Sequence, residues 1–199
     1  MKSFFSLAHN KQGTTLVELA IVLAIVAIVG AVVATGYGFI STDRINAASK
    51  ELFGDLQKIR HAAIAQGADA AVPETKGFGI RFESTRTYRL FRFNDINSNF
   101  KYDGSGEEIS LQAEATATQR EISPPIAIKI KNRSNLVDPR NTVLLFDHLG
   151  MPRQANWGFQ QKTLVIQNAD RDEIPAKCIS ISFNRIREGQ WDGSSCQER

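Results

Sequence analysis

Residues Leu19 to Ile40 form an apolar run that contains no charged side chain. As a helix rising about 1.5 Å per residue, such a run can cross a hydrocarbon layer about 30 Å thick. The run therefore predicts one membrane-spanning helix at residues 19–40. A short polar leader with two lysines comes first, and Gly13 separates this leader from the apolar run. Because a secretory signal peptide is cut after its apolar region, cleavage at Gly13 would instead leave the apolar helix in the mature protein.

Glu18 stands at the start of this run, where an ionised carboxylate is costly in lipid unless a cation pairs with it. If the chain is cleaved after Gly13, the new amine of Thr14 supplies such a cation, either within the chain or to a neighbouring copy. The alternative is a plain signal anchor in which Glu18 is incidental.

The sequence Gly13-Thr-Thr-Leu-Val-Glu18-Leu resembles the prepilin-type leader of type IV pilins and type II secretion pseudopilins. The resemblance implies that prepilin peptidase cleaves between Gly13 and Thr14 and that the new N-terminal residue, Thr14, is methylated. It also implies that Glu18, the fifth mature residue, helps the subunit dock into a growing filament. Thr14 departs from the family pattern, which most often has Phe or Met at this position.

The resemblance further implies partners and a location. The partners are other pilins or pseudopilins through the N-terminal helix, prepilin peptidase, an inner-membrane assembly platform, and lipid before assembly. The lysines of the leader place the N-terminus in the cytoplasm by the positive-inside rule, so the C-terminal domain lies outside it. We expect the protein first in the bacterial inner membrane and then in a pilus or pseudopilus filament.

Helical periodicity continues beyond the apolar run. Between Asp43 and Gln66, apolar residues recur at close to 3.6-residue spacing, namely Ile45, Ala48, Leu52, Leu56, Ile59 and Ala63. Gly67 and Pro73 end this pattern. The sequence thus predicts a leader at residues 1–13, a long helix at 14–66 and a head domain at 67–199.

The head has the periodicity of strands. Six segments predict strands: Phe78–Phe82, Thr87–Phe93, Ile126–Lys131, Thr142–Phe146, Thr163–Gln167 and Cys178–Phe183. The first two flank Ser84-Thr-Arg86 and predict a hairpin. The expected fold class is α+β, with the long helix packed on a mostly antiparallel sheet or a small sandwich.

Several head segments resemble those of GspH/FimT-type pseudopilins and minor pilins. They are Phe93-Asn-Asp-Ile-Asn-Ser-Asn99, Asp103-Gly-Ser-Gly-Glu107, the turn Gly150-Met-Pro152, and a C-terminal strand followed by an arginine pair. The resemblance implies a β-rich head on the exposed half of the N-terminal helix. It does not separate a secretion pseudopilin from a pilus subunit.

Cys178 and Cys196 are the two cysteines of the chain, and both lie far beyond the apolar run. An oxidising compartment outside the cytoplasm favours a disulfide between them. In the chain-entropy model a loop of this size stabilises the fold by about 3 kcal/mol. Zinc binding is the weaker alternative, because no pair of histidines accompanies the cysteines.

Asp95, Asn97, Asn99 and Asp103 present oxygen ligands at spacings by which a tight loop can surround Ca²⁺. An EF-hand loop, however, requires glycine and glutamate at two later positions, where this chain departs from the pattern. The competing interpretation is that these side chains hydrogen-bond their own backbone to form turns. No cofactor is expected unless this loop binds calcium.

Arg185 and Arg187 follow a predicted strand and would point to the same side. In FimT-like minor pilins, a Gly-Arg-x-Arg motif at this location is implicated in DNA binding during uptake. Here Asn184 replaces the glycine. Binding through phosphates would be weak, salt-sensitive and independent of sequence. The alternative is that the arginines are solvated or pair with nearby carboxylates.

Composition does not favour an enzyme or a strongly nucleic-acid-binding protein. The 24 basic and 21 acidic residues leave a formal charge of only +3, and the three histidines show no metal spacing or nucleophile motif. We therefore expect a structural subunit, a minor pilin or pseudopilin, with a DNA-binding minor pilin as the alternative.

Overall fold

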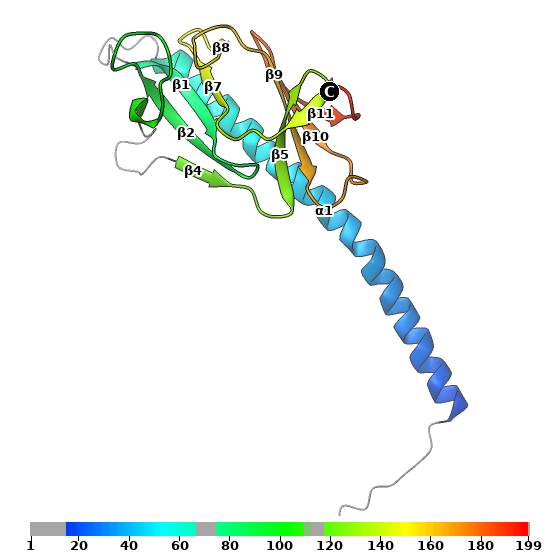
Figure 1. The fold of residues 1–199 in the computed structure, drawn as a ribbon. Coiled ribbons are helices and arrows are strands. Elements are labelled where there is room, and N and C mark those ends of the chain that lie inside the picture. The colour runs from blue at the N-terminus through cyan, green and yellow to red at the C-terminus, as the bar shows by residue number, and fades with distance from the viewer. Residues whose placement is uncertain (1–14, 67–74, 110, 112–117, 199) are drawn as a thin grey trace, which may run out of the picture. The chain divides into compact units, whose positions relative to one another are not determined.

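The computed structural model describes residues 15–66, 75–109, 111 and 118–198, without the side chains of residues 32–40, 75 and 118 (Figure 1). The chain divides into two compact units, residues 1–40 and Ser41–Arg199. The predicted leader at residues 1–13 and the proposed new N-terminus, Thr14, lie outside the described residues.

A single long helix, α1, extends from Leu16 to Gln66 and confirms the predicted helix to within two residues. Within the described residues, no helix contains a stretch of 18 residues apolar enough to cross a membrane, so the predicted span at 19–40 is not found there. The side chains of residues 32–40, in the second half of that prediction, are not among those described.

Two six-stranded sheets form the described part of the head, and all their pairings are antiparallel (Figure 1). The first has the order β3-β2-β1-β7-β8, with β4 also paired to β2, and consists of β1 (Thr75–Phe82), β2 (Thr87–Asn94), β3 (Glu108–Ile109), β4 (Thr118–Glu121), β7 (Val143–Phe146) and β8 (Pro152–Arg153). The second has the order β12-β11-β10-β9-β5-β6 and consists of β5 (Ile126–Asn132), β6 (Asn135–Val137), β9 (Lys162–Asn168), β10 (Lys177–Ile181), β11 (Ile186–Trp191) and β12 (Cys196–Glu198). A short 3-10 helix, η1 (Ser105–Glu107), precedes β3.

The α+β prediction is confirmed, and the six predicted strands all occur, as β1, β2, β5, β7, β9 and β10. The hairpin between β1 and β2 is also present. β10 ends at Ile181, two residues before the predicted end, because Ser182 already belongs to the next turn and donates its N–H to the carbonyl of Arg185. The sequence did not reveal the short or polar strands β3, β4, β6, β8, β11 and β12.

One hydrophobic core joins α1 to the inner faces of both sheets. The predicted helical stripe is buried in full, with Leu52, Leu56 and Ile59 completely inaccessible. Alternate residues of the strands face it, namely Phe78, Ile80, Phe82, Leu90, Ile126, Ile128, Ile130, Leu144, Phe146, Leu164, Ile166, Ile179, Ile181 and Ile186. This stripe is therefore the surface on which the head is built.

Polar contacts fix the position of α1 on the sheets. Tyr88 donates its hydroxyl to Asp55 at 2.9 Å, and burial together with this carboxylate raises the pKa of Tyr88 so that it stays a neutral donor. The guanidinium of Arg60 donates to the carbonyls of Gly150 (3.0 Å) and Asn184 (2.6 Å), one in a turn of each sheet. The helix is thus attached to both sheets by more than apolar packing.

A smaller aromatic cluster covers the outer face of the first sheet. Phe91, Phe93, Val143 and Leu145 form it, with Tyr102 and Trp157 packed against them. Gly79 faces this cluster, because a Cβ there would lie only 2.7 Å from the ring of Phe91. The loop that carries the predicted calcium ligands supplies Tyr102 and so helps to cover this face.

Candidate assembly site

The N-terminus of α1 is capped by a side chain two residues after the predicted cleavage point. The hydroxyl oxygen of Thr15 accepts the backbone N–H of Glu18 at 3.2 Å. Threonine before the first helical residue, with glutamate three positions later, is the capping-box pattern, and a carboxylate in the first turn is favourable next to the helix dipole. Thr15 is thus a functional residue that was not predicted from the sequence, although the Thr-x-x-Glu spacing would have indicated it.

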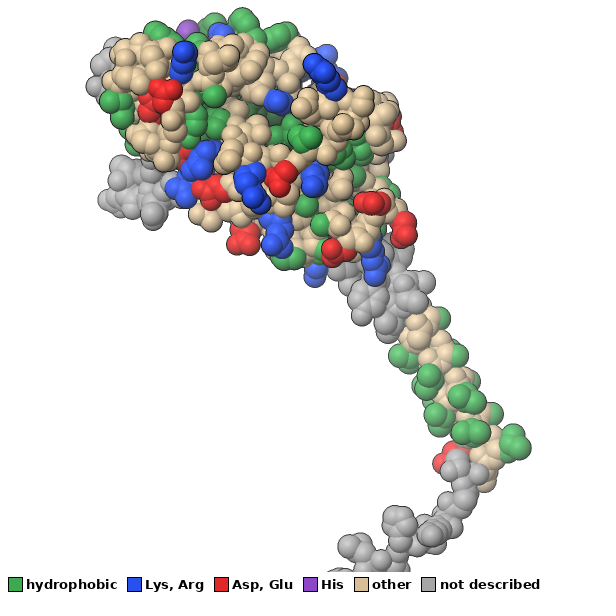
Figure 2. Space-filling model, viewed as in Figure 1, with side chains coloured by type: hydrophobic (Ala, Val, Ile, Leu, Met, Phe, Trp, Pro, Cys, Tyr) green, Lys and Arg blue, Asp and Glu red, His purple; other side chains and the backbone are tan. Residues whose placement is uncertain are grey.

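Apart from Glu18, the described N-terminal part of α1, up to Ala31, has apolar side chains all round its circumference. The large side chains Leu16, Val17, Leu19, Ile21, Val22, Leu23, Ile25, Val26, Ile28 and Val29 are each more than half exposed. In Figure 2 the described side chains along this part of the helix are almost all hydrophobic. A helix that is hydrophobic on every side is normally buried in other helices or in lipid. The side chains described here are exposed instead.

Cleavage after Gly13 and methylation of Thr14 stay predictions, because both residues lie outside the described part of the chain.

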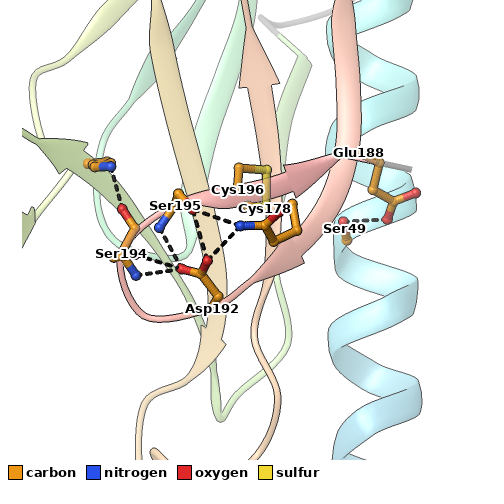
Figure 3. The surroundings of a disulfide bond; sticks show 9 residues. Ser49, Cys178, Glu188, Asp192, Ser194, Ser195 and Cys196 are labelled. Carbon is orange, nitrogen blue, oxygen red and sulfur yellow. Dashed lines mark hydrogen bonds between the residues drawn. A yellow bond between two sulfur atoms is a disulfide. The ribbon is translucent and has the colours of Figure 1, made fainter.

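Cys178 on β10 and Cys196 on β12 form the predicted disulfide, with their Cα atoms 5.7 Å apart (Figure 3). The turn between β11 and β12 is held by Asp192, whose carboxylate accepts the N–H groups of Ser194 and Ser195 at 2.8 and 2.6 Å. These hydrogen bonds, the one from Ser195 being the strongest cause, lower the pKa of Asp192. The disulfide thus fixes the C-terminal hairpin to the rest of the second sheet.

Replacing both cysteines by alanine is expected to lower the free energy of unfolding of the head by about 3 kcal/mol, because the unfolded chain regains the entropy that the closed loop removes. Urea denaturation followed by tryptophan fluorescence measures the change. The unsubstituted protein with its disulfide reduced is the control and should lose as much. A loss below about 1 kcal/mol in either case would contradict the expected stabilisation.

The loop with the predicted calcium ligands hydrogen-bonds to itself. The buried carboxylate of Asp95 accepts the N–H groups of Asn99 and Phe100, both at 3.0 Å. The side-chain amides of Asn97 and Asn99 donate to one oxygen of Asp103, at 2.9 and 2.6 Å, and lower the pKa of that carboxyl. The backbone contacts of Asp95 are those expected from the alternative, turn-forming interpretation. Among the described residues no group of three or more His, Cys, Asp or Glu side chains could hold a metal ion, and calcium binding stays a prediction.

The two arginines of the predicted DNA site lie in the turn between β10 and β11 and at the start of β11. Both are exposed, and Ile186 between them is buried. Arg187 forms an ion pair with Glu198 at 2.9 Å, whereas Arg185 lies in the turn before β11. The pairing of Arg187 matches the alternative reading of this motif. DNA binding by Arg185 and Arg187 stays a prediction.

Comparison with known proteins gives two matches. Residues 8–34 match the family model of the prokaryotic N-terminal methylation motif. The fold is similar to that of the minor pseudopilin EpsH from the type 2 secretion system of Vibrio cholerae, with a TM-score of 0.50 and 13% identity over 74% of this chain and 97% of EpsH. No curated protein matches the sequence. The chain thus carries the prokaryotic N-terminal methylation motif ahead of a head folded like that of a minor pseudopilin, in agreement with the resemblance to pilins and pseudopilins drawn from its residues.

Proposed function

We propose that this protein is a minor pilin or pseudopilin, a structural subunit that assembles into a filament through its N-terminal helix. The observation that carries the proposal is the contrast between the two halves of α1. One half has its apolar stripe buried under the head, whereas residues 19–31 contain no charged side chain and are all exposed. A helix of this kind can be held in lipid before assembly and packed among like helices afterwards.

Glu18 is the residue proposed to guide the helix from one environment to the other. After cleavage behind Gly13, its carboxylate pairs with the Thr14 amine of the adjacent subunit. An unpaired carboxylate is costly among apolar helices. The pairing therefore favours the register of neighbouring helices in which the Glu18 carboxylate lies beside the Thr14 amine. The hydroxyl of Thr15 accepts the backbone N–H of Glu18, which keeps the first turn of α1 formed and Glu18 within it.

The proposed partners and location follow from this role. Prepilin peptidase removes the leader, and an inner-membrane platform passes the subunit into the filament. The head lies outside the cytoplasm, where the Cys178–Cys196 disulfide is stable. The family motif and the pseudopilin fold support this placement.

Substitutions at Glu18 test the proposal and separate its two roles. Glu18→Ala and Glu18→Gln are both expected to reduce incorporation into sheared filaments at least about tenfold, while membrane insertion is unchanged, because each removes the charge that pairs with the amine. Glutamine can still serve in a capping box. The measurement is the ratio of subunit in filaments to subunit in membranes, by immunoblot.

Thr15→Ala is the matched control, since it removes the cap, worth about 1 kcal/mol, and keeps the charge. This variant should still be incorporated. Normal incorporation of Glu18→Gln would contradict charge pairing.

A further inference from the structure

The outer face of the second sheet has a basic groove at one end. Ser180 on β10 lies opposite Thr163 on β9, so these hydroxyl side chains share a face of the sheet. Around them is a groove of roughly 320 Å³ whose charged lining residues are Lys131, Arg133 and Lys162, and no carboxylate lines it. Lys131 also donates to the carbonyl of Ser194. The groove is therefore a positively charged depression with hydroxyl groups on its floor.

The connection between β9 and β10 is acidic. Asp170, Asp172 and Glu173 are all exposed there, with Arg171 as the one basic residue among them. The side chain of the buried Asn168 shapes this loop by accepting the N–H groups of Asp170 and Arg171, at 2.9 and 3.2 Å. A second cavity, of roughly 350 Å³, lies beside the loop. Its charged lining residues are Asp172 and Asp192, and no lysine or arginine lines it.

The groove and the β9–β10 loop lie at opposite ends of β9 and β10, because Lys162 and Ile181 line the groove whereas the loop joins Asn168 to Lys177. At the acidic end, Ala169 donates to the carbonyl of Pro125, and Arg44 at the start of the packed half of α1 donates to that of Pro124. At the basic end, the turn that follows β10 is bound by Arg60, which donates to the carbonyl of Asn184. Along the helix these two arginines are separated by about 24 Å at about 1.5 Å per residue. The basic groove and the acidic loop are thus separated along the direction of α1.

We propose that the acidic β9–β10 loop of one copy of this protein docks into the basic groove of a second copy. The two surfaces are of opposite sign and lie at opposite ends of β9 and β10, so they are different patches and the contact is head to tail. In a head-to-tail contact each added copy keeps one of its two binding surfaces unoccupied, so further copies can bind. Repetition of this contact generates an open filament. Opposite charges also select this order of ends, because like ends repel.

This inference rests on the proposed function, because the contact would form between subunits of the same filament. It gives the heads their own attachment, separate from the Glu18 pairing in the helical part. A phosphate-bearing polyanion such as DNA is the competing occupant of the groove.

Charge exchange between the two surfaces tests the contact. The full chain is purified in detergent, and self-association is followed by sedimentation and by energy transfer between labelled copies. Arg133→Glu with Lys162→Glu reverses the groove, and Asp172→Lys with Glu173→Lys reverses the loop. Each reversed protein alone should associate at least about tenfold more weakly, because attraction becomes repulsion. Association of the unsubstituted protein should also weaken as salt rises from about 20 to about 300 mM.

Mixing the two reversed proteins should restore association, and so should all four substitutions in one chain. Arg140→Glu, a reversal of an exposed arginine outside both surfaces, is the matched control and should associate normally. The proposal is overturned if mixing fails to restore association, or if the reversed proteins associate like the control. It is also overturned if groove reversal abolishes retention of a duplex DNA probe and leaves self-association unchanged. Glu18 is intact in all these variants, so loss of the contact between heads and loss of filament incorporation are measured separately. Either proposal can therefore fail while the other holds.

Discussion

Leu56→Ala is expected to lower the free energy of unfolding of the head by about 4 kcal/mol. Leu56 is 0% exposed and lies in the middle of the stripe by which α1 contacts both sheets. Truncation removes the transfer free energy of the buried side chain and leaves a cavity that surrounding strands cannot fill, because two hydrogen-bonded sheets and a helix enclose it. Urea denaturation of a fragment of residues 41–199, which holds the packed half of α1, measures the change.

Ile64→Ala is the control for this experiment, because it removes aliphatic carbon from the same helix at a side chain that is 45% exposed. It should cost less than about 1.5 kcal/mol. Equal losses in the two variants would show that helix propensity, and not burial against the sheets, dominates the effect.

Asp147→Ala is expected to destabilise the head by a comparable amount, about 3 to 5 kcal/mol. Asp147 is buried at the end of β7, and one carboxylate oxygen accepts the N–H groups of Leu149 and Met151, both at 2.9 Å. The other oxygen accepts the guanidinium of Arg153 at 2.8 Å. Removing the carboxylate leaves three donors without their acceptor, one of them a largely buried cation.

Asp147→Asn separates the two parts of this loss. Its amide oxygen can still accept the backbone N–H groups, whereas its amide N–H₂ would face Arg153, so a smaller loss of about 2 kcal/mol is expected. Asp138→Ala, at an exposed carboxylate 4.0 Å from Arg140, should change stability by less than about 0.5 kcal/mol. An Asp147→Ala protein as stable as this control would mean that water replaces the lost acceptor.

The parts of the fold that the sequence predicted are those with a regular apolar period. The helical stripe around Leu52 and the alternation of Phe78, Ile80 and Phe82 each bury one face, so burial produces a periodic pattern of apolar residues in the sequence. β11 has no such pattern, because Ile186 is its only buried large apolar residue. Its residue Glu188 faces α1, where the carboxylate accepts the hydroxyl of Ser49. Gly189 in the same strand is required by the close approach of β12, since a Cβ there would lie 2.4 Å from the carbonyl oxygen of Gln197.

The candidate sites divide in the same way. The motif around Gly13 and Glu18 and the pairing of the two cysteines could be read from the chain itself, because each depends on short spacing or on a compartment. The charges at the two ends of the second sheet could not, since Lys131, Arg133 and Lys162 meet only through the register of β5 with β9. Asp147 was missed for a similar reason, because its partners become visible only once the turn after β7 is formed.

The contacts between α1 and the last strands have a consequence for the order of folding. Ser49 bonds to Glu188 across 139 residues of sequence, and Arg60 bonds to Asn184 across 124 (Figure 3 shows the first pair). During synthesis the packed half of the helix therefore emerges long before the strands that complete its cover. Contacts this distant in sequence close slowly, so the nascent head keeps an uncovered apolar stripe until β10 and β11 arrive. The C-terminal hairpin is thus the last part to be made, and its arrival ends the period in which the unfinished subunit is exposed to aggregation.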